Sequence, residues 1–397
     1  MSGPLEGIRV LDLSRILSGP YCTMTLSDMG AEVIKVERPE VGDRSRGIGP
    51  FMGNQSSYFM SINRGKKSVT IDIFNPDGRS IITELIRQSD ILVENFVPGI
   101  MRRLDLHYEA VQQINPSIIY ASITGFGQDG PYGQKPAMDI VVQAMGGMMS
   151  ITGAPDGPPV RSGSSMGDIT AGLFTAIAIL GALEARHKSG NGQKIDISML
   201  DCQLAIQENA ITRYLHTGEI PGPLGSRHSS ATPFQAFKTK NGWIVVAMIG
   251  GEIDRWGLFC NAIDHPDLIE DPRFAENWIR TQNYSQLEPI FNEALKRKTS
   301  EEWLSEFESL GIVCGPVNNI SQVVEDPQVR HRQMITKVNH TSLGKIDAIN
   351  TPLRFSETPA LVEQGAPELG EHTDQVLGNI LGIGERELDR LRSKGAI

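Results

Sequence analysis

The N-terminal half of the chain alternates between short apolar runs and helix-like segments, and no other feature constrains its fold as strongly. The run at 8–13 (IRVLDL) is rich in branched side chains, as buried parallel strands usually are. A helix beginning near Pro20 and ending near Gly30 is expected next, followed by a second strand at 31–37. Such a strand–helix–strand unit is normally right-handed, and its ligand crevice lies at the carboxyl ends of the strands.

The alternation continues beyond this first unit. Asn75-Pro76 offers an N-cap residue followed by a proline at the first helical position. Further strands are expected at 68–73, 91–96, 117–124 and 194–198, and further helices at 108–114, 137–149 and 169–186. Repetition of this kind predicts an α/β fold with a doubly wound, Rossmann-like parallel sheet.

The sequence changes character after residue 217. Segment 218–233 contains three Gly and three Pro, as a linker does. Beyond it, 234–249 alternates around Asn241-Gly242, which favours a hairpin with a type I′ turn. Helices are expected at 254–263, 280–295 and 301–310, and Thr299 with Glu302 forms a capping box before the last of them. These elements predict a smaller α+β domain.

Strand-like sequence returns near Lys345, and a polar helix at 385–393 is expected to dock on the first domain. The predicted large domain therefore has an N-terminal part at 1–217 and a C-terminal part, with a return linker, at 336–397. The linker and small domain occupy 218–335.

Composition limits the class of protein and its partners. The chain has 397 residues, of which 40% are hydrophobic and 21% charged, as expected for a soluble protein of two domains. The net charge of -10 argues against nucleic acid as a partner but leaves room for a local basic pocket. Four scattered cysteines predict reduced thiols in the cytoplasm and no metal site. No signal peptide is expected, and the apolar run at 169–183 is interpreted as too short and too rich in Gly and Thr to span a membrane.

Asp168 follows a Ser/Gly-rich loop and opens a long run without another charge until Glu184. The common interpretation is an N-cap, because a carboxylate accepts the unpaired N–H groups of a first helical turn. The alternative is an acid at the mouth of a buried helix, facing a glycine-lined cavity. Local sequence leaves both open.

The crevice after the first strand carries no dinucleotide fingerprint. Only Gly19 and Gly30 are available there, so no G-x-G-x-x-G approaches a pyrophosphate, and NAD is not expected. Basic residues do follow successive strands at Arg15, Arg38 and Arg103. Guanidinium groups in such loops suit phosphate oxygens, although any single one fits an ordinary solvated surface equally well.

Several longer motifs occur in a specific order: LEGIRVLDLSRILSGP, MGAEVIKVERPEVGD, SINRGKKSVTIDI, DILVENFVPG, SITGFGQDGPY, PAMDIVVQAMGG, GPPVRSGSSMGD and LGSRHSSATPFQAF. With them the chain resembles the class III CoA-transferases of the CaiB/BaiF family along essentially its whole length. The resemblance implies a large α/β domain, a small domain, and two chains interlocked as a homodimer. It also implies that coenzyme A takes part as a thioester substrate, without metal.

By the same resemblance, Asp168 is the nucleophile that attacks a donor thioester and then carries CoA as an aspartyl thioester. N–H groups at the start of its helix would stabilise the developing oxyanions, so capping and catalysis are compatible. The implied CoA site comprises Arg15, Ile16, Leu17, Ser18, Arg38, Ile71, Asp72, Ile73, Phe74, Asn95, Phe96, Arg103, Lys135, Ala137 and Met138.

The chain departs from the formyl-CoA transferases at three places. Phe74 and Pro136 replace lysines, with Lys135 as the candidate substitute, and the glycine-rich loop is reduced to Gly250-Gly251. Formyl-CoA and oxalate are therefore not the expected substrates. The segments KTKNGWIVVAM, DPRF and GPVNNI favour the branch acting on succinyl-CoA and dicarboxylic acids.

Other functions remain as alternatives. The related α-methylacyl-CoA racemases place a His before the Asp of a G-H-D motif, where this chain has Met138, and a thioether cannot exchange a proton. A non-catalytic CoA-binding protein is the other alternative. Arg227 and His228, with Gly250 and Gly251, are candidates for binding the acceptor acid, although Arg227 and His228 also suit a structural role at the domain junction.

Overall fold

The computed structural model describes residues 3–249, 255–360 and 362–397. Two compact units divide the chain. The first comprises 3–148, 161–215 and 327–397, and the second comprises 149–160 and 216–326. Segment 149–160 thus belongs to the second unit, whereas its sequence predicts a place in the large domain.

A parallel sheet forms the centre of the first unit, and within the described residues it has six strands in the order β5-β2-β1-β6-β7-β8. The strands are β1 (Arg9–Asp12), β2 (Glu32–Glu37), β5 (Lys67–Thr70), β6 (Ile91–Glu94), β7 (Ile119–Thr124) and β8 (Lys194–Ser198). The strand order reverses between β1 and β6. In a sheet of this kind the ligand crevice lies beyond the carboxyl ends of the strands at that reversal.

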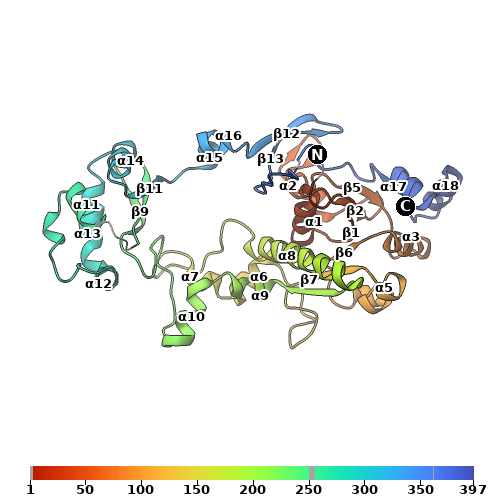
Figure 1. Ribbon diagram of the computed structural model, residues 1–397, viewed down its shortest axis with the longest axis horizontal. Helices are drawn as coiled ribbons and strands as arrows, with labels where there is room; N and C mark the ends of the chain where they lie inside the picture. Colours follow the sequence, from red (N-terminus) through yellow and green to blue (C-terminus); the bar gives the residue numbers. More distant parts are fainter. Residues whose placement is uncertain (1–2, 250–254, 361) are drawn as a thin grey trace. The chain divides into compact units, whose positions relative to one another are not determined.

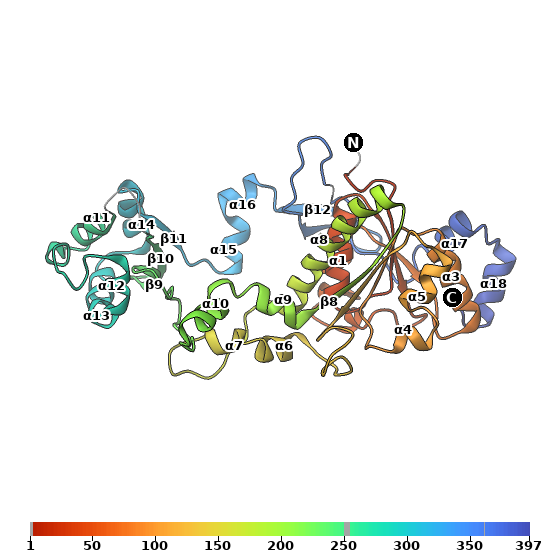
Figure 2. The ribbon, with the colours of Figure 1, turned by 60° about the horizontal axis from the view of Figure 1, so that its bottom comes forward.

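Helices cover both faces of this sheet, as the doubly wound pattern predicts (Figures 1 and 2). One face carries α1 (Ser18–Asp28), α8 (Met166–Ser189) and α9 (Met199–Ala205). The other carries α3 (Pro76–Arg87), α5 (Tyr108–Ile114), α17 (Thr373–Leu381) and α18 (Glu385–Ser393). Leu388 and Leu391 of α18 are buried in the core of the first unit, so the predicted return of the C-terminal helix is confirmed.

Several shorter helices and strands lie outside these two layers and outside the second sheet. They are β3 (Phe51–Met52), β4 (Gln55–Ser56), the 3₁₀ helix η1 (Arg44–Gly47), α2 (Ser57–Ile62), α4 (Ile100–Arg103), α6 (Asp139–Met145), α7 (Met148–Ile151), α10 (Glu208–Thr217), α15 (Ile320–Glu325), α16 (Pro327–His331), β12 (Ile335–His340) and β13 (Gly344–Ile349). The expected strand after Lys345 is β13, which pairs with β12 in a separate antiparallel hairpin.

The second unit contains an antiparallel sheet in the order β11-β10-β9, packed against helices through an aromatic core that includes Phe259, Phe291 and Trp303. Its elements are β9 (Phe234–Lys238), β10 (Trp243–Ala247), α11 (Arg255–Ala262), η2 (Pro266–Leu268), α12 (Asn277–Gln282), α13 (Tyr284–Leu295), α14 (Ser300–Ser309) and β11 (Val313–Pro316). The capping box of Thr299 and Glu302 is confirmed at the start of α14.

Two local predictions in these units are wrong. The hairpin of β9 and β10 forms, but four residues connect Lys238 to Trp243, and neither Asn241 nor Gly242 has the positive φ of a type I′ turn. Instead, Asn241 accepts a hydrogen bond from the Ser300 N–H (2.8 Å), so it ties the loop to α14. The helix expected at 137–149 is interrupted at Gly146 and becomes α6 and α7.

Helix α8 is longer than its sequence pattern predicts. At 24 residues it is long and apolar enough to cross a membrane by length and composition, so its length does not exclude a membrane span. Half of its most apolar stretch is buried inside the protein, and α8 packs against α1 and β7. This packing is that of a core helix, with Ala171, Ala176 and Ile179 turned into the core.

Candidate active site

The loops that follow β1 and β6 are joined at the point where the strand order reverses. The Arg15 N–H donates to Asn95 Oδ1 (2.8 Å), and Asn95 Nδ2 donates back to the Arg15 carbonyl (2.8 Å). Asn95 Nδ2 also donates to the Ser18 hydroxyl (3.3 Å). The Arg15 guanidinium lies over the Phe96 ring, 4.5 Å from its centre, which is a favourable cation–π distance. These contacts hold the loops after β1 and β6 together at the base of the crevice.

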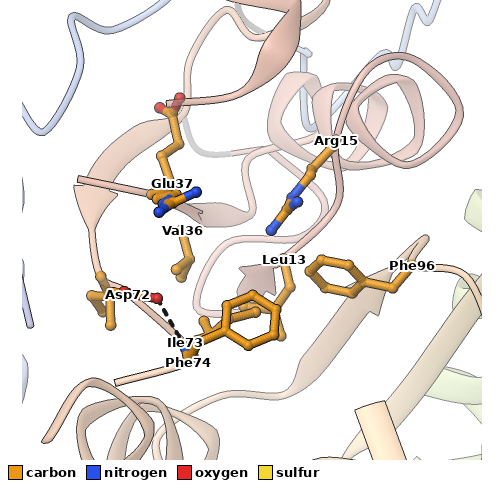
Figure 3. Close-up of a pocket in the computed structure, with 10 residues that line it drawn as sticks. Leu13, Arg15, Val36, Glu37, Asp72, Ile73, Phe74 and Phe96 are labelled. Carbon is orange, nitrogen blue, oxygen red and sulfur yellow. Dashed lines mark hydrogen bonds between the residues drawn. The ribbon is translucent and has the colours of Figure 1, made fainter. Parts of the chain in front are cut away.

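A small pocket lies along the carboxyl ends of β5, β2, β1 and β6, and we call it the strand-end pocket (Figure 3). The Arg15 guanidinium and the rings of Phe74 and Phe96 point toward one another in it. It is lined by Leu13, Arg15, Val36, Glu37, Arg38, Ile71, Asp72, Ile73, Phe74 and Phe96. The pocket thus combines apolar and aromatic surfaces with two guanidinium groups, which suits a ligand with a flat ring and phosphates.

A larger cleft adjoins it beyond β1, β6 and β7, and we call it the Asp168 cleft. Its volume is about 430 Å³. Its lining residues are Ile16, Ser18, Ile48, Tyr58, Asn95, Phe96, Val97, Pro98, Ile123, Thr124, Gly125, Lys135, Pro136, Ala137, Met138, Asp139, Ile140, Arg161, Ser165, Asp168 and Met199. Asn95 and Phe96 therefore contribute to the lining, and Phe96 borders both cavities.

Asp168 is not the N-cap of α8. The N-cap is Ser165, and Asp168 is the third residue of the helix, with its carboxylate in the cleft. The Gly167 N–H at the start of α8 donates to Asp139 Oδ1 (2.8 Å). Asp139 also accepts from Gln143 Nε2 (2.7 Å). A carboxylate from α6 thus takes the capping role, so the interpretation of Asp168 as the N-cap of this helix is wrong.

Ser18, the first residue of α1, supplies donors to Asp168 instead. Both its hydroxyl and its backbone N–H lie close enough to the Asp168 carboxylate to lower the pKa of that acid as donors. This meeting depends on a close approach of α1 and α8, where a Cβ on Gly172 would lie 2.7 Å from the Ser18 carbonyl oxygen. The run of small residues in α8 therefore allows the two helices to pack closely enough for Ser18 to reach Asp168 (Figure 1).

The surroundings of Asp168 shift its pKa in opposing directions. Burial and the neighbouring charge of Asp139 raise the pKa of Asp168 to about 6, against the lowering effect of the Ser18 hydrogen bonds. Burial, together with the charge of Asp168, also raises the pKa of Tyr58, whose side chain lines the same cleft. A carboxylate that is ionised near neutral pH and largely removed from solvent is a competent nucleophile or base.

Most residues of the predicted CoA site line the two cavities. Ile16, Ser18, Asn95, Lys135, Ala137 and Met138 line the Asp168 cleft, Arg15, Arg38, Ile71, Asp72, Ile73 and Phe74 line the strand-end pocket, and Phe96 lines both. Leu17 is buried as the residue before α1, and the exposed Arg103 on α4 lines neither cavity. Arg102, its neighbour, borders a separate polar pocket that contains Glu94 and Lys194.

The predicted acceptor residues lie in the second unit. Arg227 stacks on Tyr284, 4.1 Å from the ring centre, and His228 packs against Phe234 at 4.9 Å. These contacts give both side chains a structural place in that unit. Gly250 and Gly251 lie outside the described residues.

Sequence reasoning missed three residues of the cleft. Arg161, Tyr58 and Asp139 all line it, and Asp139 appears in the sequence only as part of a comparison motif. Arg161 had a usable signal, because it belongs to the same Ser/Gly-rich loop that precedes Asp168. Tyr58 had none, since a lone tyrosine in a polar segment has many uses.

The described part of the chain contains no cluster of three His, Cys, Asp or Glu side chains that could hold a metal ion.

Comparisons with known proteins agree on one family. The model of CoA-transferase family III matches residues 5–373. The chain is 40% identical over 395 residues to the succinyl-CoA:glutarate CoA-transferase of Homo sapiens, covering 99% of this chain and 90% of that protein. It is 39% identical over 369 residues to the acetyl-CoA:oxalate CoA-transferase of Acetobacter aceti, covering 92% and 94%.

A solved structure extends the match to the fold. A CaiB/BaiF family protein from Brucella suis superposes with a TM-score of 0.85 at 36% identity, covering 96% of this chain and all of that one. The chain therefore belongs to CoA-transferase family III, as its motifs predict, and it is an enzyme of that family. The large parallel α/β sheet is the fold of these relatives.

Proposed function

We propose that the protein transfers coenzyme A between a small acyl-CoA and a free carboxylic acid through a thioester on Asp168. The observation that carries this proposal is the Asp168 carboxylate itself. It lies with Ser18 in a cleft beside the strand-end pocket, and it has a pKa of about 6. It is therefore largely ionised at neutral pH, as a carboxylate nucleophile must be.

The reaction balances without any external co-reactant. An Asp168 oxygen attacks the thioester carbonyl of the donor, the C–S bond breaks, and CoA thiolate leaves behind a mixed anhydride. The thiolate attacks the Asp168 carbonyl carbon of that anhydride, which releases the donor acid as a carboxylate. An acceptor carboxylate then attacks the aspartyl-CoA thioester and releases the thiolate again. Attack of the thiolate on the acceptor carbonyl forms the new acyl-CoA and restores the Asp168 carboxylate.

Each attack on a carbonyl carbon places negative charge on its carbonyl oxygen, which belongs either to the Asp168 side chain or to the substrate. The Ser18 N–H and hydroxyl favour the charged form of this carboxylate, so they are candidates to stabilise that developing charge. The residues of the strand-end pocket would hold the nucleotide of CoA, with Arg15 and Arg38 toward its phosphates. Arg103 stays a predicted phosphate contact from outside that pocket.

The charge of the cleft supports a small dicarboxylic acid as a substrate. Lys135 and Arg161 contribute cations to a cleft whose wall is otherwise largely apolar, apart from the acids near Asp168. One carboxylate of a dicarboxylate would react at Asp168, and the other would need a cation. The names of the human and Acetobacter relatives, which are transferases for glutarate and oxalate, agree with such acids.

We further propose that the chain acts in the cytoplasm as an interlocked homodimer. Leu173, Phe174, Ile177 and Leu180 of α8 expose between 36% and 62% of their surfaces, and such an apolar row is typical of an interface. All four cysteines lie in the described residues and none forms a disulfide, which suits a reducing compartment.

Covalent capture tests the proposal directly. The protein is incubated with succinyl-CoA, treated with borohydride, digested, and examined by peptide mass analysis. We expect a reduced residue at Asp168, and no reduction in Asp168→Asn, which should also lose at least ~10³-fold in transfer rate. Full turnover by Asp168→Asn would refute the proposal. Exchange of the α-proton with solvent, without transfer, would favour the racemase-like alternative, and CoA binding without either reaction would favour a non-catalytic protein.

A further inference from the structure

The short segment that carries Ser18 begins with a strained backbone. Ile16 has a φ of +65°, in the left-handed region that a β-branched residue rarely adopts. Strain of this kind persists only where surrounding contacts hold it. The neighbours of Ile16 are Arg15, which stacks on Phe96, and Leu17-Ser18, which begin α1 at Asp168. Whatever fixes Ile16 therefore fixes the donors to the Asp168 carboxylate.

A buried ion pair provides this fixation. The Ile16 N–H is directed at the Asp43 carboxylate, with 3.2 Å to Oδ1 and 3.3 Å to Oδ2. Lys35 Nζ donates to Asp43 Oδ2 (2.9 Å) and to the Ser14 carbonyl (3.0 Å). The side chains of Lys35 and Asp43 are 0% and 1% exposed. The pair thus forms hydrogen bonds with the backbone on both sides of Arg15, at Ser14 and at Ile16.

The cost of burying this pair makes it a poor device for stability alone, because a well-packed apolar pair would serve as well. Its hydrogen bonds run to the backbone that leads into Ser18. We propose that Lys35 and Asp43 are positioning residues, which hold segment 14–16 so that Ser18 presents its N–H and hydroxyl to Asp168. This inference rests on the proposed function, because it takes Asp168 to be the reacting group.

The same helix offers a matched control. Arg64 and Asp28 form a second buried pair, at 2.6 Å with 8% and 6% exposure, but at the opposite end of α1. That end is about 15 Å from Ser18 for a helix of this length. Loss of either pair should lower stability, whereas only loss of the Lys35–Asp43 pair should act on the reaction.

A double-mutant cycle separates positioning from a merely structural role. Steady-state transfer from succinyl-CoA to glutarate is measured for Asp43→Asn, Ser18→Ala, the double variant and Asp28→Asn, with folding checked by circular dichroism. We expect Asp43→Asn to lower kcat by about 10- to 100-fold with KM changed less than about threefold. In the Ser18→Ala background the same change should cost at least about threefold less, because only the backbone N–H of residue 18 is left to be displaced. Asp28→Asn should keep kcat within about twofold of the wild type.

Equal costs of Asp43→Asn in the two backgrounds would overturn the inference, as would an equal kcat loss in Asp28→Asn. If Asp43→Asn does not fold, Lys35→Met/Asp43→Leu takes its place in the cycle, because it leaves no unpaired buried charge while removing the acceptor for Ile16. Asp168→Asn is assayed beside them. Full transfer by that variant would refute the proposed function, whereas an inactive Asp168→Asn with additive costs would refute only the positioning role.

Discussion

Two groups of buried acids lie near the carboxyl edge of the parallel sheet, and their pKa values are shifted in opposite directions. Asp12 and Asp43, beneath the loop after β1, face the buried ammonium groups of Lys66 and Lys35. Burial alone would raise the pKa of Asp12, but Lys66 and Lys35 outweigh it and hold that pKa below its usual value. The pKa of Asp43 is likewise lowered to about 2 against the effect of burial, chiefly by Lys35.

Asp168 and Glu94, along the cavities, follow the other pattern. Burial raises the pKa of Asp168 to about 6 and that of Glu94 to about 7. Glu94 accepts a hydrogen bond from the Phe96 N–H (2.8 Å), yet this bond does not offset its desolvation. The comparison teaches that a cation placed under a buried acid decides its role. Asp12 and Asp43, which have lysine partners, stay charged, while Asp168 and Glu94 titrate near neutrality and are available for chemistry.

The largest effect is expected from removing a cation of the first group. Lys66 Nζ donates to Asp12 (3.1 Å), to the Pro20 carbonyl and to Asn63. Lys66→Met would leave the fully buried Asp12 without its principal counter-ion, and we expect about 3–5 kcal/mol of lost stability in urea denaturation. Lys67→Met is the control, because Lys67 pairs with Glu32 at the surface and should cost only about 0–1 kcal/mol. Equal costs would contradict the comparison.

The fall of kcat/KM at low pH depends on the pKa of Asp168, an acid of the second group. Because the reacting carboxylate must be ionised, kcat/KM for the acyl-CoA should fall tenfold per pH unit below about 6, and by about 100-fold in all by pH 4. Asp139→Asn removes a neighbouring negative charge, so the midpoint should move to lower pH. The measurement is the pH profile of both proteins over the range in which circular dichroism shows them folded. A wild-type midpoint near 4 would contradict the raised pKa.

A smaller effect is expected from neutralising Glu94. Its folded-state pKa of about 7 lies above the ordinary 4.5, so the folded protein binds the proton more tightly than the unfolded chain. Wild-type stability therefore declines as pH rises from about 4.5 through 7. Glu94→Gln does not titrate, and it should be more stable than the wild type by about 2 kcal/mol at pH 8 but not at pH 4. Urea midpoints at the two pH values test this, with the exposed Glu84→Gln as the pH-insensitive control.

The smallest effect is expected from Asp168→Asn, which should also raise stability at high pH. The pKa of Asp168 lies above the ordinary 3.8, and its charged form is only partly desolvated, so Asp168→Asn should gain about 1 kcal/mol at pH 8 and nothing near pH 3.8. Thermal denaturation at both pH values measures the difference. A loss of stability at pH 8 would mean that the charge of Asp168 is better compensated than its surroundings indicate. If Asp168→Asn gains stability at pH 8 and loses CoA transfer, then the protein retains Asp168 for its activity although the residue lowers stability.

Local signals predicted the parts of the fold that depend on neighbours in sequence. Asn75-Pro76 starts α3, 108–114 is helical as expected, and Thr299 caps α14, because each signal and its target lie within a few residues. The strand–helix alternation predicted the parallel sheet for the same reason, since strand length and apolar run are local properties. The helix break at Gly146 was not predictable from those rules, because α6 ends against residues of α9.

By itself the sequence determined the α/β class, the family and the choice of Asp168, since ordered motifs and periodicity need no coordinates. Only the tertiary structure decided that Asp139, 28 residues before Gly167, takes over the start of α8. It alone also decided that Ser18 meets Asp168 and that burial raises the pKa of that acid. The physical reason is that hydrogen bonds between distant segments and loss of solvent exist only after packing, so no local pattern encodes them.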